Sequence, residues 1–220
     1  MPQLIPEWLW PCLKPLSPEN ESQQQKRLLS AREKVEQVSL GDKSDVALDE
    51  ARRLFDAEQE RRRGADSKAG LYLAAITALI PILATVLPSL WDEQISKALR
   101  HILVGIFICA LLYLMRAGLW ALQTIKVSAV VQLGPGDIAQ SFYSNNPEEN
   151  LAKQLLNAVI YNYHGTNQKI SYINMAYEFL VRVFFCFAAF LIVPVAWPTA
   201  AWAIDRIHNE VLAPLMSCFP

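Results

Sequence analysis

The side chains that could carry out catalysis are scattered along this chain, and they form no recognisable catalytic set. The three histidines, His101, His164 and His208, lie far apart, so no pair has the short spacing of a metal site. The sequence contains no G-x-S-x-G motif, no phosphate-cradling glycine loop and no kinase motif set. We therefore expect no enzyme activity, no catalytic residues, no metal and no resident cofactor.

Arginines inside apolar stretches are a stronger signal. Arg116 and Arg182 both lie within long apolar runs, and an arginine near the bilayer centre costs at least ~2.5 kcal/mol. Arg182 lies near the start of its run, where the side chain can snorkel to the interface. Arg116 lies about 15 Å of helix from Lys126, so snorkelling, a place inside the helix bundle and pore lining all remain open. Glu178 and Asp66 are acids at the level where both arginines could pair.

A third group of polar residues precedes the last apolar run. Amide, imidazole and ammonium groups can donate or accept hydrogen bonds, which suits either a small ligand or polar contacts between helices. Both interpretations remain open from the residue types alone. The group comprises Asn157, Asn162, His164, Asn167, Lys169 and Asn174.

Three long apolar runs determine the fold class. Hydrophobic residues make up 53% of the 220 residues and charged residues only 19%, below the roughly 25% charged residues of soluble domains. A helix needs about 20 apolar residues to cross a bilayer, and we predict spans at 69–90, 101–122 and 180–202. Pro81, in the middle of the first span, predicts a helix kink. The sequence thus indicates an all-α membrane protein with three transmembrane helices and a small helical cytosolic domain.

The basic residues near the first span predict its orientation. Six of them precede it, whereas the short loop at 91–100 contains only Lys97 and Arg100. Basic residues favour the cytoplasmic side, so the N-terminal part and the segment 126–175 are expected there, and the tail 203–220 on the other side. The six residues are Arg52, Arg53, Arg61, Arg62, Arg63 and Lys68.

The segments before the first span divide into two parts. Residues 1–18 are rich in proline and tryptophan, and proline disfavours helix. Residues 19–65 predict cytosolic helices, with a first helix at 19–38 and a break at Gly41. Ser44 or Asp45 can cap a second helix, which we expect to continue through Lys68 into the first span.

The segment 126–175 predicts a loop followed by a helix. Its glycines and proline indicate a turn at 133–137. Asn146 as the cap, Pro147 at the first position and two glutamates after it predict a helix start. We expect one long helix from there into the third span.

The pattern resembles the membrane effectors of bacterial anti-phage nucleotide signalling, the Pycsar-type and SLATT-type transmembrane effectors. The resemblance covers about residues 50–195 and rests on three features. The stretch 65–80, ADSKAGLYLAAITALI, is similar to the family's entry into its first span; two closely spaced spans then precede a cytoplasmic insertion; and in 151–185 Lys169 is followed by the pair Ala176-Tyr177.

This resemblance implies a function without catalysis. The chain would be a defence effector in the bacterial inner membrane that oligomerises on a nucleotide signal and impairs membrane integrity, causing growth arrest or cell death. A cyclic nucleotide is the implied ligand, and the implied partners are the lipid bilayer and further copies of the chain. No direct nucleic-acid binding is expected. The candidate residues for ligand binding or signal coupling are Asp66, Lys68, Asn167 and Lys169.

Two other functions remain open. A membrane toxin restrained by a protein or nucleoprotein partner, as in retron-type defence, would use the unmatched residues 1–45 as the contact. A membrane scaffold or channel subunit outside defence would need only the three spans.

Overall fold

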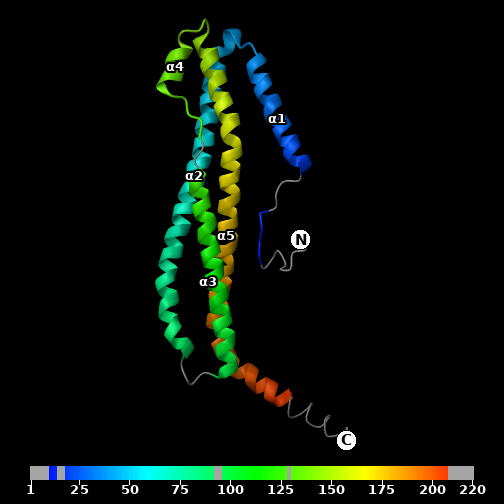
Figure 1. Ribbon diagram of the computed structural model, residues 1–220, viewed down its shortest axis with the longest axis vertical. Coiled ribbons are helices and arrows are strands. Elements are labelled where there is room, and N and C mark those ends of the chain that lie inside the picture. Colours follow the sequence, from blue (N-terminus) through cyan, green and yellow to red (C-terminus); the bar gives the residue numbers. More distant parts are fainter. Residues whose placement is uncertain (1–9, 14–17, 92–95, 128–129, 208–220) are drawn as a thin grey trace. The chain divides into compact units, whose positions relative to one another are not determined.

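The computed structural model describes residues 10–13, 18–91, 96–127 and 130–207 (Figure 1). These residues are 90% helical and include no strand. Most of the segment 1–18, including Trp8, and most of the tail 203–220 lie outside them. The elements are α1 (Pro18–Gln37), η1 (Gly41–Lys43), α2 (Ser44–Val86), η2 (Leu87–Trp91), α3 (Lys97–Lys126), α4 (Pro135–Ser141) and α5 (Pro147–Ile207).

Three of these helices, α2, α3 and α5, contain a stretch long and apolar enough to cross a membrane. The predicted class, an all-α membrane protein with three apolar spans, is confirmed. The chain divides into two compact units. Unit 1 comprises residues 1–74 and 118–176, and unit 2 comprises residues 75–117 and 177–220. The boundaries fall inside the three long helices, so each of these helices contributes to both units.

The helix starts follow the local sequence. Pro18 begins α1 with Glu19 in the first turn, and Pro147 begins α5 with two glutamates after it. Proline fits the first turn because its missing N–H has no partner to lose there, and acids favour the positive end of the helix. Gly41 separates α1 from α2 with φ +48°, a left-handed conformation that glycine adopts without strain. These starts and the break agree with the sequence predictions.

The expected continuous helices are also confirmed. α2 runs without interruption past Gly64 and Pro81, and α5 passes Gly165 within one helix of 61 residues. The first span was predicted to be helical to residue 90. The α-helix ends at Val86, and a 3₁₀ helix follows it.

The prediction of a turn at 133–137 is wrong. Pro135 begins the short helix α4, and Gly134 precedes it in an extended conformation. The Asp137 carboxylate accepts a hydrogen bond from the Gly134 backbone N–H at 2.8 Å. Proline at the first helical position and this side-chain bond favour a helix start, and they outweigh the two glycines.

In unit 1, α2 and α5 run parallel in a nearly constant register. Three polar contacts link residues that are 104, 106 and 103 positions apart: Ser44 with Glu148, Arg61 with Asn167, and Asp66 with Lys169. Buried or half-buried positions on both helices alternate at three and four residues, the spacing of a coiled-coil seam. On α2 these positions are Leu48, Ala51, Phe55, Glu58, Arg62, Ala65 and Ala69, and on α5 they are Ala152, Leu155, Val159, Asn162, Thr166, Lys169 and Ile173.

Apolar clusters close both ends of this seam. Leu48 and Ala51 pack with Ala152 and Leu155 in one cluster. The other cluster joins Ala69 of α2, Ala121 of α3, and Ile173 and Ala176 of α5. The small alanines allow the helix backbones to approach closely. The polar residues of the seam therefore lie between two apolar ends.

Unit 2 has a core of its own and an apolar surface. Leu90, Leu99 and Leu103 are buried and pack with residues of α5 that include Phe190 and Trp197. Large apolar side chains are also exposed over its helices, where lipid tails would cover them in a membrane. They include Ile80, Ile82, Leu112, Met115, Leu191 and Val195.

Candidate functional site

An ion pair with a buried lysine joins α2 and α5 about one turn before the cluster of Ala69 and Ile173. The Lys169 ammonium donates a hydrogen bond to the Asp66 carboxylate at 2.5 Å. The Lys169 side chain is 3% exposed and that of Asp66 is 41% exposed. Lysine is almost never this buried without a partner. The pair therefore joins the two helices at a defined register.

A second polar contact lies about one turn before this pair. Arg61 donates to the Glu58 carboxylate at 2.7 Å and to the Asn167 side-chain oxygen at 3.0 Å. Its guanidinium also lies 5.7 Å from the centre of the Tyr163 ring, within cation–π range. Glu58 is buried, so the guanidinium compensates its charge inside the seam. We call Glu58, Arg61, Asp66, Asn167 and Lys169 the polar layer.

Asn162 fixes the segment after α3 to the same seam. Its side-chain amide accepts from the Val131 N–H and donates to the Val131 carbonyl, both at 2.9 Å. The Asn162 residue is buried, and this pair of bonds satisfies both backbone groups of Val131. The chain between α3 and α4 is thereby held against α5.

The structure brings three of the four predicted ligand or coupling residues together. Asp66, Asn167 and Lys169 belong to the polar layer. Lys68 does not join them: it is exposed, because two residues turn a helix by about 200° and point its side chain away from that of Asp66. The sequence missed the roles of Glu58 and Arg61, since a solvated helix face contains the same residue types.

The residues predicted as intramembrane charges have separate surroundings. In unit 2, Arg182 pairs with Glu178 at 2.9 Å within α5, as the sequence suggested. Arg116 is half-buried in α3. Pro81 lies inside α2, where it cannot donate the usual bond to the carbonyl four residues earlier.

Asp66 also borders a polar hollow of about 540 Å³. Arg62 and Arg63 line the hollow with Gln59 and Gln132. The hollow therefore contains two cations and one carboxylate, and the carboxylate is already engaged by Lys169. The Asp66 carboxylate partly neutralises the two arginines, and this weakens the attraction of the hollow for an anion.

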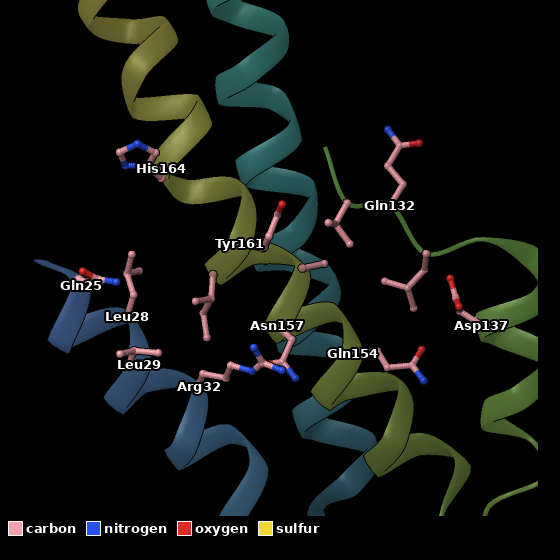
Figure 2. Close-up of a pocket in the computed structure, with 14 residues that line it drawn as sticks. Gln25, Leu28, Leu29, Arg32, Gln132, Asp137, Gln154, Asn157, Tyr161 and His164 are labelled. Atoms are coloured by element: carbon pink, nitrogen blue, oxygen red, sulfur yellow. The ribbon is translucent and has the colours of Figure 1, made fainter. Parts of the chain in front are cut away.

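A second site, of mixed polarity, lies between α1 and α5. This pocket has a volume of about 520 Å³, within the range of small-molecule sites. Figure 2 shows side chains of α1, α5 and the segment before α4 around it. Its apolar lining comprises Leu28, Leu29, Val131, Leu133, Ala158 and Ile160, and its polar lining comprises Gln25, Arg32, Gln132, Asp137, Gln154, Asn157, Tyr161 and His164.

Two acceptors in this pocket lack hydrogen-bond partners within the described part of the chain. They are the side-chain oxygens of Gln154 and Asn157, both buried. The nitrogens of the same amides donate to Asn150 and to Glu36, each at 3.4 Å. Buried acceptors are usually satisfied. Both oxygens are also shielded from solvent, so they do not face the open space of the pocket.

The sequence indicated only part of this pocket. Asn157 and His164 belong to the polar group noted before the last apolar run. Gln25 and Arg32 were not singled out. Their spacing with Leu28 and Leu29 places all four on one helical face, but which face α5 covers depends on tertiary packing.

Comparisons of the chain with protein-family models, with curated proteins and with solved structures find no match. The functional assignment therefore depends on the residues and geometry of unit 1 and on the three apolar helices.

Proposed function

We propose that this protein is a non-enzymatic membrane effector of an anti-phage defence system. In this proposal it lies in the bacterial inner membrane with its N-terminus in the cytoplasm. A nucleotide signal reaches unit 1, several copies assemble, and the membrane loses its integrity. Growth then stops or the cell dies.

The parallel register of α2 and α5 is the observation that supports this proposal best. Both helices contribute the polar layer of unit 1 and then continue as apolar segments of unit 2. A helix transmits rotation and translation along its length because each turn is hydrogen-bonded to the next. A change in the seam at the polar layer would therefore reach two of the three spans directly.

The arginines within the apolar helices support a function in which the protein impairs the membrane. Arg116 and Arg182 lie in helices long enough to cross a bilayer, and intramembrane arginines are typical of functional sites. Three spans of one chain enclose little space. A route for ions would therefore need several copies, which is why the proposal includes oligomerisation.

Induced expression in a bacterium tests the proposal. Membrane potential and entry of an impermeant DNA dye are followed alongside growth, with and without co-expression of a nucleotide cyclase. We expect depolarisation and dye entry to precede growth arrest and to require the cyclase. An Arg116→Leu/Arg182→Leu variant tests whether the intramembrane charges take part, and Arg27→Gln on α1 serves as the expression-matched control. Growth arrest with intact membranes would rule out this mechanism.

The exposed apolar residues of α1 favour one second candidate, a toxin restrained by a partner protein. Leu29 on α1 and Val38 just after its end are exposed, a surface that a partner could cover. Deleting residues 1–39 would then release toxicity without any nucleotide. Continued dependence of the deleted form on the cyclase would reject this alternative.

A further inference from the structure

We propose that the polar hollow at Arg62 and Arg63 binds the headgroup phosphate of an anionic phospholipid at the edge of the membrane. Such binding goes beyond the proposed function and does not depend on a role in defence. It requires only that the three long apolar helices lie in a bilayer, which their length and composition allow.

The hollow keeps a net positive charge. Arg62 and Arg63 line it, and Asp66 is the acid that lines it among the residues that the structure describes. The Asp66 carboxylate already pairs with the buried Lys169 ammonium, so that pair is neutral as a whole. Asp66 therefore weakens the charge of the two arginines but does not cancel it.

Both guanidinium groups are suited to a phosphate. Arg63 is exposed, and its bond to the Gln59 side chain is long, at 3.5 Å. Arg62 is half-buried and donates to the Val127 carbonyl, also at 3.5 Å. A guanidinium has five N–H donors in a planar fork and binds phosphate oxygens in a bidentate manner. Each arginine can therefore contact a phosphate while it keeps its contact within the chain.

The hollow lies where the exposed apolar surface of α3 ends. In unit 1 the last turns of α3 expose three apolar residues, which lipid tails would cover in a membrane: Leu119, Leu122 and Ile125. Lys126 follows at the helix end and is exposed. The next residue is Val127, whose carbonyl Arg62 contacts. An apolar surface for acyl chains and a cationic site for a phosphate thus meet within a few residues.

The distance along α2 agrees with this position. The charge-free run of the first span begins at Ala69, about 9 Å of helix after Arg63. The headgroup region extends roughly 5–8 Å beyond the hydrocarbon on each side. A long arginine side chain that snorkels toward the interface can cross the remaining distance to the phosphates.

Aromatic side chains mark the same level on three helices. Tyr72 of α2 and Trp120 of α3 pack against the cluster that contains Ala69. The Trp120 ring centre lies 5.4 Å from that of Tyr172 on α5. Tyrosine and tryptophan are enriched at membrane–water interfaces because they combine an apolar ring with a polar group. These rings place the interface about one turn from Asp66, which borders the hollow.

The size and lining of the hollow favour a headgroup with hydroxyl groups. Its volume of about 540 Å³ leaves room for more than a phosphate. The side-chain amides of Gln59 and Gln132 also line it and can bond to hydroxyls. The ammonium group of ethanolamine or choline would be repelled by the two arginines. We therefore expect phosphatidylglycerol to bind in preference to phosphatidylethanolamine and phosphatidylcholine.

Native mass spectrometry of the purified full chain in detergent tests this assignment. The three lipids are added separately with identical acyl chains, and the affinity of the first bound lipid is measured. We expect phosphatidylglycerol to bind roughly tenfold more tightly than phosphatidylcholine, since each arginine near the surface contributes about fivefold toward an anionic lipid and Asp66 offsets part of this gain. Equal affinity for the three lipids would refute the site.

Two matched arginine pairs on α2 locate the binding. Arg62→Gln/Arg63→Gln should lower the affinity for phosphatidylglycerol to about that for phosphatidylcholine, and Arg63→Gln alone should lower it about fivefold. Arg52→Gln/Arg53→Gln removes the same charge ten residues earlier on the same helix and should leave the affinity unchanged.

Circular dichroism checks that each variant keeps its helices. Arg63 is exposed, so its single variant decides the matter if the double variant does not fold. An unchanged preference for phosphatidylglycerol in Arg63→Gln would overturn the proposal. An equal loss in the Arg52→Gln/Arg53→Gln chain would do the same, because overall charge and not the hollow would then explain the binding.

Soluble probes separate a lipid headgroup from a free phosphate. Inorganic phosphate and glycerol 3-phosphate carry the same chemical group without acyl chains. We expect neither to displace phosphatidylglycerol even in large excess, since the acyl chains bind the apolar surface of α3. Displacement by glycerol 3-phosphate at concentrations close to that of the lipid would assign the hollow to a soluble phosphate and would reject the phospholipid.

Discussion

Lys169 on α5 donates to Asp66 on α2 across 2.5 Å, yet the lysine side chain is 3% exposed and the aspartate side chain 41%. The ammonium therefore has little access to water, whereas the carboxylate keeps part of its hydration. The two residues are 103 positions apart in the chain. Their pairing depends on the register of α2 against α5.

This difference in exposure predicts that a substitution of Asp66 and a substitution of Lys169 change the unfolding free energy by different amounts. Asp66→Asn leaves a buried ammonium without its counter-charge, and we expect a loss of about 1–3 kcal/mol in unfolding free energy, below the value for a fully buried pair because Asp66 is partly hydrated. Lys169→Met removes the buried charge and keeps the side-chain length, so it should cost less than about 1.5 kcal/mol.

Chemical unfolding of the purified chain, followed by circular dichroism, measures both values. The double variant Asp66→Asn/Lys169→Met should be more stable than Asp66→Asn alone. Arg53→Gln, which breaks an exposed pair with Glu50, is the matched control and should change stability by less than about 1 kcal/mol. A double variant no more stable than Asp66→Asn would contradict the role of the buried ammonium.

The bond between Asn162 and the Val131 backbone leads to a second prediction. Asn162→Leu should remove both hydrogen bonds to the Val131 backbone and lower stability by roughly 1–3 kcal/mol, at about 0.5–1.5 kcal/mol for each bond. Hydrogen exchange at the Val131 amide should accelerate strongly. Asn174→Leu at an exposed position of α5 is the control. If the Val131 amide exchanges no faster in Asn162→Leu, the hydrogen bonds between Asn162 and Val131 do not form in solution.

Glu149 makes stability depend on pH. The hydrogen bond from Lys153, at 2.8 Å, lowers the pKa of the Glu149 carboxyl below its ordinary value. The unfolded chain then takes up this proton at a higher pH than the folded chain does. The stabilisation is therefore present at neutral pH and is lost as the pH falls through the lowered pKa.

We accordingly expect Glu149→Gln to reduce the acid sensitivity of unfolding and to lower stability at neutral pH. The measurement is the unfolding free energy of both chains over the acidic range. Glu33→Gln on the exposed face of α1 is the control for the loss of one negative charge. Parallel curves for wild type and Glu149→Gln would refute the assignment.

The shared register predicts the effect of an insertion. Two glycines after Gly64 turn the rest of α2 by about 200° and separate Asp66 from Lys169. If the α2–α5 pair couples the signal to the spans, this variant should lose signal-dependent depolarisation. The same insertion after Ser39, in the linker between α1 and η1, should keep it. Full response of the Gly64 insertion would exclude coupling through α2.

Much of the secondary structure could be predicted because it depends on neighbouring residues. Pro18 and Pro147 mark helix starts through their own fixed φ and the acids after them, and both starts were correctly predicted. The three apolar runs were visible because a span needs about 20 apolar residues in sequence. The prediction of a turn at 133–137 was wrong for a local reason. The glycines favour a turn, but the Asp137 carboxylate accepts a hydrogen bond from the Gly134 N–H and stabilises a helix start.

The sequence by itself therefore determined the helices, the three apolar spans and a set of polar residues near them. It did not determine which of those residues meet. Asp66 pairs with Lys169, Lys68 points away, and Arg32 faces Asn157 across a pocket only because α1 and α5 are packed in one particular way. Such contacts join residues more than 100 positions apart. They depend on the register of the helices and on which face each helix turns to its neighbour. Local composition leaves both open, and tertiary packing decides them.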